Sequence, residues 1–161
     1  MLIRVATIQD IPAIQQIAHT TWPVAYGTIL SQEQLTYMLD MMYSEASLQK
    51  QFADGHLFFM AEVDGQPDGF ASVSLEKDAV YKLNKLYVLP TTQKTGAGKA
   101  LLHAVTGCAR ELGGRQLILQ VNRYNNAKGF YEKHGFTILQ EVKLNIGNGY
   151  FMDDYIMGRE L

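Results

Sequence analysis

Hydrophobic and polar residues recur along this chain with two periods, one typical of helices and one typical of short buried strands. The most regular helical period spans residues 97–112, where one face carries Ala97, Ala100, Leu101, Ala104, Val105, Cys108, Ala109 and Leu112. Apolar segments at 2–6, 57–63, 70–75 and 81–88 are shorter, and turn residues follow several of them, which favours strands. The chain is therefore predicted to combine helices with a sheet.

Three helices are predicted between the first two strands. A stripe of isoleucines, with a proline in the first turn, predicts a helix over about residues 10–20. Ser31 and Gln34 form a capping box before a second helix, and Ser44 is placed to cap a third. The aromatic segment 22–27 contains a proline and is predicted to be irregular.

The C-terminal part is predicted to contain three more strands and one short helix. The strands are expected at 116–121, 136–143 and 150–159, with the helix at 126–134 and a turn at Asn148-Gly149. The order of elements is then βααα-βββ-α-β-α-ββ. This order predicts an α/β (α+β) fold in which helices flank a mixed central sheet.

Composition narrows the class of protein. The chain has 161 residues, of which 47% are hydrophobic, and it shows no repeat or linker, so residues 1–161 are predicted to form one domain. Its 14 Lys and Arg residues against 16 Asp and Glu residues give a formal net charge of −2. Because duplex nucleic acid is bound through broad basic surfaces, no nucleic-acid partner is expected.

The same sequence favours a soluble protein of the cytoplasm. Cys108 is its one cysteine and has no partner for an internal disulfide, which suits a reducing compartment. The first residues lack the features of a signal peptide, and no apolar run approaches the roughly 20 residues that span a bilayer. No membrane partner is expected. The four histidines are scattered without ligand spacing, so no metal is expected either.

A glycine-bearing loop precedes the long helix. The strand end at 86–90 leads into Gln93-Lys94-Thr95-Gly96-Ala97-Gly98-Lys99. Glycines permit close approach of a ligand, and the free N–H groups of a first helical turn form an anion site. The segment lacks the first glycine and the Ser or Thr of a Walker loop, and Leu101 replaces the third glycine of the dinucleotide motif. A tight turn with close helix packing is the alternative interpretation.

A second segment follows 24 residues after Gly98, which leaves room for one helix and one strand. It reads Asn-Arg-Tyr-Asn-Asn-Ala-Lys-Gly-Phe-Tyr-Glu-Lys-His-Gly-Phe over residues 122–136 and contains Tyr131. A phenol is protonated at neutral pH, so it can donate a proton to a leaving group. A tyrosine that only packs against the core is the alternative for this side chain.

Together the two segments resemble the signature motifs of the GNAT family of N-acetyltransferases. Residues 93–98 match the family's Gln/Arg-x-x-Gly-x-Gly/Ala motif, and residues 122–136 resemble its asparagine-containing motif that continues as Phe-Tyr-x-x-x-Gly-Phe. The resemblance runs from Leu2 to Tyr155. It implies the GNAT fold and acetyl-CoA as the cosubstrate.

The resemblance also assigns residues to acetyl-CoA. It implies that a strand backbone pairs with the pantetheine arm, through Leu86, Tyr87 and Val88, and that loop amides hold the pyrophosphate, through Gln93, Lys94, Thr95, Gly96, Ala97, Gly98 and Lys99. The family's asparagine near the pantetheine corresponds either to Asn125 or to Asn122. Lys128 and Lys133 either solvate the outer helix face or meet the 3′-phosphate.

The chemistry implied by the resemblance is direct acetyl transfer to an amine in a ternary complex. Tyr131 matches the general acid that protonates the leaving thiolate, and a backbone N–H near Val88 would polarise the thioester carbonyl. Many relatives carry a glutamate on the strand at 81–88, whereas this strand has no carboxylate. The group that takes the amine's proton is therefore open, with a water chain or Glu76 as candidates.

The acceptor is expected to be a primary amine of a small molecule, with a polyamine-like compound as one possibility. A protein N-terminus or a lysine is the alternative acceptor, and a coenzyme A-binding sensor without turnover is the alternative function. Candidates for contacting the acceptor are Trp22, Tyr26 and Glu33, followed by Tyr37, Asp153 and Asp154. Analogy with relatives suggests a homodimer.

Overall fold

The computed structural model describes residues 1–91 and 94–161, so the predicted role of Gln93 lies outside the described part of the chain. Seven strands of this part form one mixed sheet in the order β1-β2-β3-β4-β5-β7-β6. The strands are β1 (Leu2–Val5), β2 (Leu57–Val63), β3 (Gln66–Lys77), β4 (Val80–Val88), β5 (Gln116–Asn122), β6 (Thr137–Gly147) and β7 (Tyr150–Glu160). The mixed sheet predicted from the sequence is confirmed.

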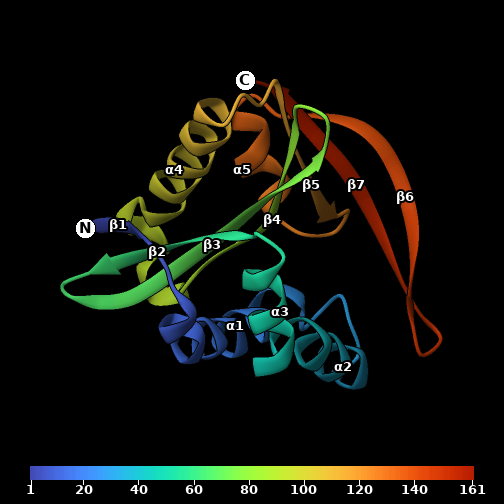
Figure 1. Ribbon diagram of the computed structural model, residues 1–161. Helices are drawn as coiled ribbons and strands as arrows, with labels where there is room; N and C mark the ends of the chain where they lie inside the picture. The colour runs from blue at the N-terminus through green and yellow to red at the C-terminus, as the bar shows by residue number, and fades with distance from the viewer.

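Helices cover both faces of the sheet (Figure 1). They are α1 (Ile11–Tyr26), α2 (Gln32–Tyr43), α3 (Glu45–Ala53), α4 (Ala97–Glu111) and α5 (Ala127–Lys133), with short 3-10 turns η1 (Ile8–Asp10) and η2 (Pro90–Thr95). One hydrophobic core lies between the sheet and α1 to α3, and a second core packs α4 and α5 against the opposite face. The predicted order of elements is confirmed. None of the described helices is long and apolar enough to cross a membrane.

The prediction that residues 22–27 are irregular is wrong, because α1 continues through this segment to Tyr26. Ile14, Ala18, Trp22 and Tyr26 follow one another at four-residue spacing and are all buried. Pro23 removes one helical hydrogen bond, at a cost of about 3 kcal/mol. Burying the two aromatic side chains removes roughly 150–250 Å² each from water, worth about 4–6 kcal/mol apiece. Burial therefore outweighs the proline.

An extra residue interrupts β4 and changes which face its side chains meet. Ser72 and Val73 of β3 are adjacent, but they pair with Lys85 and Leu83, so Asn84 is bulged. Side chains of a regular strand alternate between the faces, and one inserted residue reverses the order beyond it. Leu83 accordingly packs into the core beneath α4, while Lys85 lies on the face covered by α1 to α3.

The parallel pair β4 and β5 separates part of the way along. Their ladder runs from Val80 paired with Gln116 to Leu83 paired with Leu119, although the strands continue to Val88 and Asn122. On its other side β4 stays paired with β3 as far as Val88. The sheet consequently opens between β4 and β5 at the end that faces η2 and α5.

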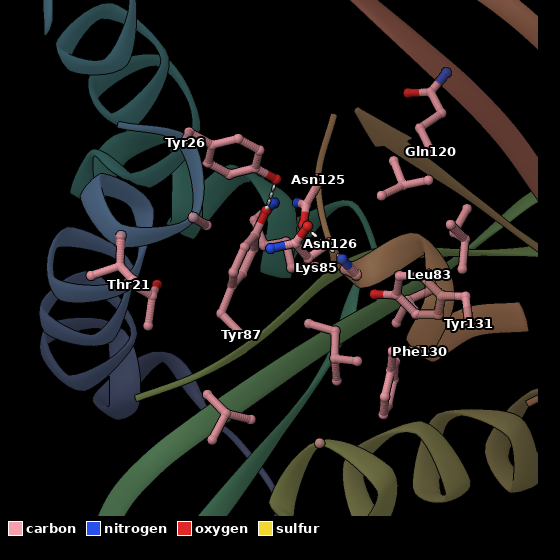
Figure 2. A pocket seen from close by; sticks show the side chains of 18 of the residues that line it. Thr21, Tyr26, Leu83, Lys85, Tyr87, Gln120, Asn125, Asn126, Phe130 and Tyr131 are labelled. Carbon is pink, nitrogen blue, oxygen red and sulfur yellow. Dashed lines mark hydrogen bonds between the residues drawn. The ribbon is translucent and has the colours of Figure 1, made fainter. Parts of the chain in front are cut away.

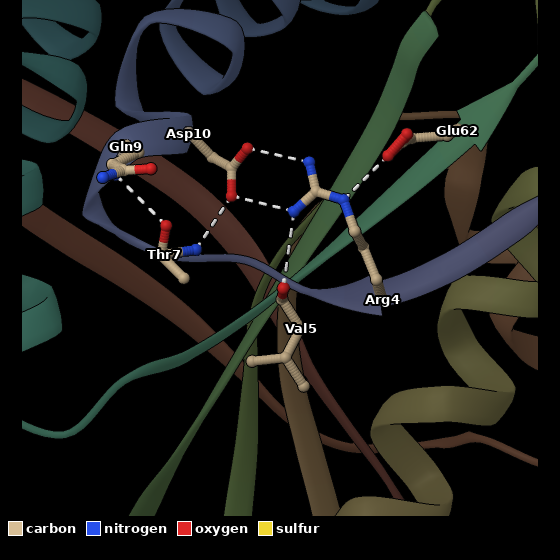
Figure 3. Close-up of polar contacts among 6 residues, drawn as sticks. All are labelled: Arg4, Val5, Thr7, Gln9, Asp10 and Glu62. Atoms are coloured by element: carbon tan, nitrogen blue, oxygen red, sulfur yellow. Dashed lines mark hydrogen bonds and ion pairs between the residues drawn. The ribbon is translucent and has the colours of Figure 1, made fainter. Parts of the chain in front are cut away.

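Arg4 joins the first strand to the start of α1 (Figure 3). Its guanidinium donates two hydrogen bonds to the Asp10 carboxylate, at 2.8 and 3.0 Å, and one to Glu62 at 2.8 Å. Asp10 also accepts from the Thr7 amide at 2.8 Å, which completes a capping box. The hydrogen bonds from Arg4 hold the pKa of the Asp10 carboxyl below its ordinary value.

Replacing Asp10 by Asn is expected to lower the free energy of unfolding by about 1–2 kcal/mol at pH 7, because the charged bonds to Arg4 are lost from a partly exposed site. Because the pKa of Asp10 is lower in the folded state, its carboxylate stabilises the fold above the unfolded-state pKa of about 3.9. This stability is lost as the pH falls through the folded-state pKa. The difference between wild type and variant should therefore shrink below about pH 4 in urea unfolding curves. Asp78→Asn, in the exposed turn between β3 and β4, is the control. Equal losses in both variants would contradict this role.

Candidate active site

A cavity of about 530 Å³ lies where β4 and β5 separate (Figure 2). Both strands contribute to its wall, β4 with residues 83–88 and β5 with residues 119–121. The C-terminal part of α1 closes one side, and the start of α5 closes the other. The opening between the two strands thus connects the two faces of the sheet.

The first turn of α4 borders this cavity. Gly96 caps the helix with a φ of 84°, a left-handed conformation that favours glycine, and the first helical bond is from the Ala100 amide to the Gly96 carbonyl at 3.0 Å. The earlier amides of the turn have no acceptor within the helix. Gly98 lines the cavity without a side chain, while Ala97 is buried in the core. Lys94, Thr95 and Lys99 are exposed at this end.

Tyr131 extends from α5 into the cavity, and Figure 2 shows its hydroxyl pointing toward the middle of the space. The residue is only 8% exposed because its ring packs against Phe130 and Phe136. Burial raises the pKa of its phenol well above the ordinary value, and the nearby Tyr26 raises it further. The phenol is therefore protonated throughout the neutral range, and a group in the cavity can reach its hydroxyl.

Tyr26 and Tyr87 face Tyr131 from the other side of the opening. Their hydroxyls share a hydrogen bond of 3.0 Å, and burial raises the pKa of both phenols. The Tyr87 ring packs with Trp22 and Phe70 in the core beneath α1. These contacts hold the ring in place at the edge of the cavity. Leu86 and Val88 line the same cavity.

The structure separates the two asparagines that the sequence leaves open. Asn125 lines the first cavity, its amide lies beside the Tyr26 hydroxyl, and its side-chain oxygen accepts from the Ala127 amide at 2.9 Å. Asn122 is buried and accepts from the Tyr124 amide at 3.0 Å, which holds the turn after β5. Asn122 lies instead on the wall of a second cavity.

This second cavity, of about 320 Å³, lies on the side of the sheet covered by α1 to α3. It shares six lining residues with the first: Tyr26, Leu83, Asn84, Lys85, Tyr87 and Gln120. Sequence reasoning did not identify Lys85, Gln51 or His56 as part of a site. Burial lowers the pKa of His56, which keeps its imidazole neutral at pH 7. Burial also lowers the pKa of Lys85. The two cavities therefore adjoin each other across a shared wall with polar and apolar residues.

The residues predicted to contact an acceptor divide into two groups. Trp22 and Tyr26 line the second cavity, and so does Asp154. Glu33 lines neither cavity and is exposed in the first turn of α2, where a negative charge suits the positive end of the helix. Glu76 and Asp153 are likewise exposed. The structure therefore gives no support to Glu33 as a contact residue.

The two lysines of α5 differ in their surroundings. Lys128 lies over the Tyr155 ring, 5.7 Å from its centroid, and pairs with Glu132 at 3.3 Å. Lys133 is exposed near the C-terminal end of the helix, where a positive charge is favourable. Lys128 thus has partners on its own side of the sheet, while Lys133 projects from the exposed end of the helix.

Comparison with known proteins places this geometry among related chains. Residues 28–148 match the family model described as an acetyltransferase (GNAT) domain. An uncharacterized N-acetyltransferase of Mycobacterium tuberculosis is 32% identical over 154 residues, which cover 94% of this chain and 98% of the relative. An aminoglycoside N(6′)-acetyltransferase of Stenotrophomonas maltophilia is 32% identical, covering 81% of this chain and 86% of the relative.

A similar solved structure is the PaiA N-acetyltransferase of Thermoplasma acidophilum in complex with coenzyme A. It superimposes with a TM-score of 0.84 over the whole of both chains at 24% identity. This likeness concerns the fold.

Two glycines of the α4 region should respond oppositely to alanine. Gly96→Ala is expected to lower the free energy of unfolding by about 1–2 kcal/mol, because a Cβ is strained at positive φ. Gly107→Ala lies within the same helix, where a Cβ meets nothing within 4 Å, and should raise stability by about 0.5–1 kcal/mol. Thermal melting of both variants checks the pair. A stabilising Gly96→Ala change would contradict the left-handed cap.

Proposed function

The chain belongs to the GNAT family of N-acetyltransferases, enzymes that use acetyl-CoA, and on this premise we propose that it transfers the acetyl group to a primary amine of a small molecule. Transfer is direct, with acetyl-CoA and amine bound together. The observation that carries the proposal is the position of the Tyr131 phenol, at the opening between β4 and β5 and beside the cavity that would hold the acceptor.

The residues around the first cavity fit the arm and the phosphates of acetyl-CoA. The cavity, of about 530 Å³, lies where β4 and β5 separate, and residues 86–88 of β4 form part of its wall. The unsatisfied amides at the start of α4 are donors for a diphosphate, each such bond being worth about 1.5–3 kcal/mol to a charged acceptor. Gly98 leaves room for close approach. Acetyl-CoA supplies the activated acetyl group, and these residues bind and orient it.

The phenol of Tyr131 supplies the proton for the leaving thiolate. A thiol has an ordinary pKa near 8.5, so a thiolate leaving at neutral pH is stabilised by a donor within hydrogen-bonding distance. Because burial keeps Tyr131 protonated, its hydroxyl donates to the sulfur as the carbon–sulfur bond breaks. The amine nitrogen forms the new bond to the acetyl carbon, and its proton passes to water, since β4 supplies no carboxylate.

The acceptor enters through the second cavity, which adjoins the first at Tyr26 and Tyr87. Trp22 supports this wall from below, with its ring 4.6 Å from that of Tyr26. In this proposal Trp22 and Tyr26 contribute a packed aromatic surface beside the acceptor. Asn125, beside the Tyr26 hydroxyl, is the asparagine that we assign to the pantetheine side.

Replacing Tyr131 by Phe should lower kcat by about 10²-fold or more, since the general acid is removed while the packed ring remains. The affinity for acetyl-CoA should change little. The measurement is release of free coenzyme A, followed with a thiol reagent, at saturating acetyl-CoA and amine.

Tyr81→Phe is the matched control, because Tyr81 is partly buried at the closed end of β4 and lines neither cavity. It should retain the wild-type kcat. An unchanged kcat in Tyr131→Phe would remove the catalytic role of this phenol, and tight coenzyme binding without thiol release for any amine would favour a sensor.

The glycine pair also tests the phosphate site. Gly96→Ala shifts the first turn of α4 and is expected to raise the Kd of coenzyme A by about tenfold, equivalent to one charged hydrogen bond. Gly107→Ala, about three turns further along the helix, should leave the Kd unchanged. Isothermal titration of both folded variants with coenzyme A is the measurement, and equal Kd values would place the phosphates elsewhere.

A further inference from the structure

Lys85 is a buried cation on the wall shared by the two cavities. Its side chain is 6% exposed, and its ammonium donates a hydrogen bond of 2.8 Å to the Gln51 side-chain oxygen. The same ammonium lies 5.4 Å from the centroid of the Tyr43 ring. Both partners are neutral. Over the described ranges, no carboxylate forms an ion pair with Lys85.

The arrangement around Lys85 is fixed by its neighbour. The Gln51 amide nitrogen donates to the Met42 carbonyl at 2.9 Å and to the Ser47 hydroxyl at 3.1 Å, so its oxygen is the atom that faces Lys85. Burial lowers the pKa of Lys85 to about 8, which still leaves the ammonium charged at pH 7. A buried charge without a counter-charge is costly, and an anion entering the cavity would relieve that cost.

Asp154 lies on the wall of the same second cavity. It is 7% exposed, and its Oδ1 atom is fully buried and accepts no hydrogen bond from the described residues. Burial raises its pKa to about 6, so the carboxylate is mostly ionised at pH 7. Because Asp154 lines the cavity, its carboxylate is placed to accept a hydrogen bond from a bound ammonium group.

The balance of charge in the second cavity is unfavourable for polycations. Its charged lining residues, within the part of the chain that is described, are Lys82, Lys85 and Asp154, since the His56 imidazole is neutral. In the first cavity Lys85 is the charged side chain among the described lining residues. A ligand with several amines would meet two lysines and one carboxylate. A ligand with one ammonium and one anionic group matches the walls better.

The remaining wall of the second cavity is apolar. Met38, Met41, Met42, Leu144, Ile146 and Met152 line it. Methionine is flexible and fills irregular spaces, so this surface suits a nonpolar body of variable shape. The cavity volume of about 320 Å³ suits one small molecule.

We propose that the acceptor is an amino-carboxylate with an apolar body, an amino-acid-like molecule whose ammonium is held by Asp154 and whose carboxylate is held by Lys85. This inference rests on the proposed function and names the substrate class of the same site. It follows from two buried, oppositely charged side chains that line one cavity and do not pair with each other. Asp154 and Lys85 are specificity-determining residues in this scheme.

Matched pairs of amines test the carboxylate requirement. L-methionine and L-leucine are each compared with the amine that lacks the carboxylate, 3-(methylthio)propylamine and isoamylamine, by thiol release at saturating acetyl-CoA. Spermidine, an aminoglycoside and a short peptide complete the panel. The expected result is a kcat/KM at least about tenfold higher for one amino acid than for its decarboxylated partner, the size of one charged hydrogen bond.

Three variants separate the two contacts. Lys85→Met should lower kcat/KM for the amino acid by a factor about ten times larger than for its decarboxylated partner. Asp154→Asn should lower both by similar factors, because both carry the amine. Lys77→Met, an exposed residue of β3, removes the same charge away from the site and should change neither. Thermal melting confirms that each variant is folded.

The outcomes distinguish this inference from the proposed function. A wild-type preference for spermidine, the aminoglycoside, the peptide or the decarboxylated amines overturns the inference and leaves acetyl transfer to amines standing. Equal losses for both members of a pair in Lys85→Met also overturn it, since the lysine would then act on acetyl-CoA. Absence of thiol release with every amine overturns the proposed function and the inference together.

Discussion

The separation of β4 and β5 after the Leu83–Leu119 pair is the constraint on which the site depends. Evenly spaced hydrogen bonds hold parallel strands together. Where this ladder ends, the backbone and side chains of both strands border an open space. The separation lets side chains from opposite faces meet, Tyr26 from α1 and Tyr131 from α5. Residues of the separated strands also line both cavities. A continuous sheet would have kept these groups apart.

Much of the fold was predictable because local patterns and tertiary packing agree. The apolar face of α4 is regular, and the strands of the central sheet end near turn residues, so their order and type were predicted correctly. The exception is the end of α1, where Pro23 suggested a break. The four-residue spacing of Ile14, Ala18, Trp22 and Tyr26 was the signal that favoured a continuous helix.

The site was predictable where a sequence motif marks it, and Trp22, Tyr26 and Asp154 of the second cavity were candidates without a motif. Two motifs stand at the starts of helices that border the cavity. One contains Gly96 and Gly98 before and in α4, and the other contains Tyr131 in α5. Lys85 carries no such mark and was not a candidate. A lysine on a strand is usually exposed, and its burial here depends on α3 and on the bulge at Asn84, which no local pattern indicates.

The bulge at Asn84 reverses which face of the sheet the odd-numbered side chains of β4 meet. Before it, odd-numbered residues such as Tyr81 and Leu83 support the core under α4, and after it odd-numbered residues such as Lys85 and Tyr87 face the opposite layer. Substitution of Lys85 or Tyr87 would therefore change the layer under α1 to α3, while Leu83, Leu86 and Val88 keep the packing under α4. If Asn84 took a place in the regular ladder instead, every later residue of β4 would face the other layer, so the extra residue decides which side chains border the cavities.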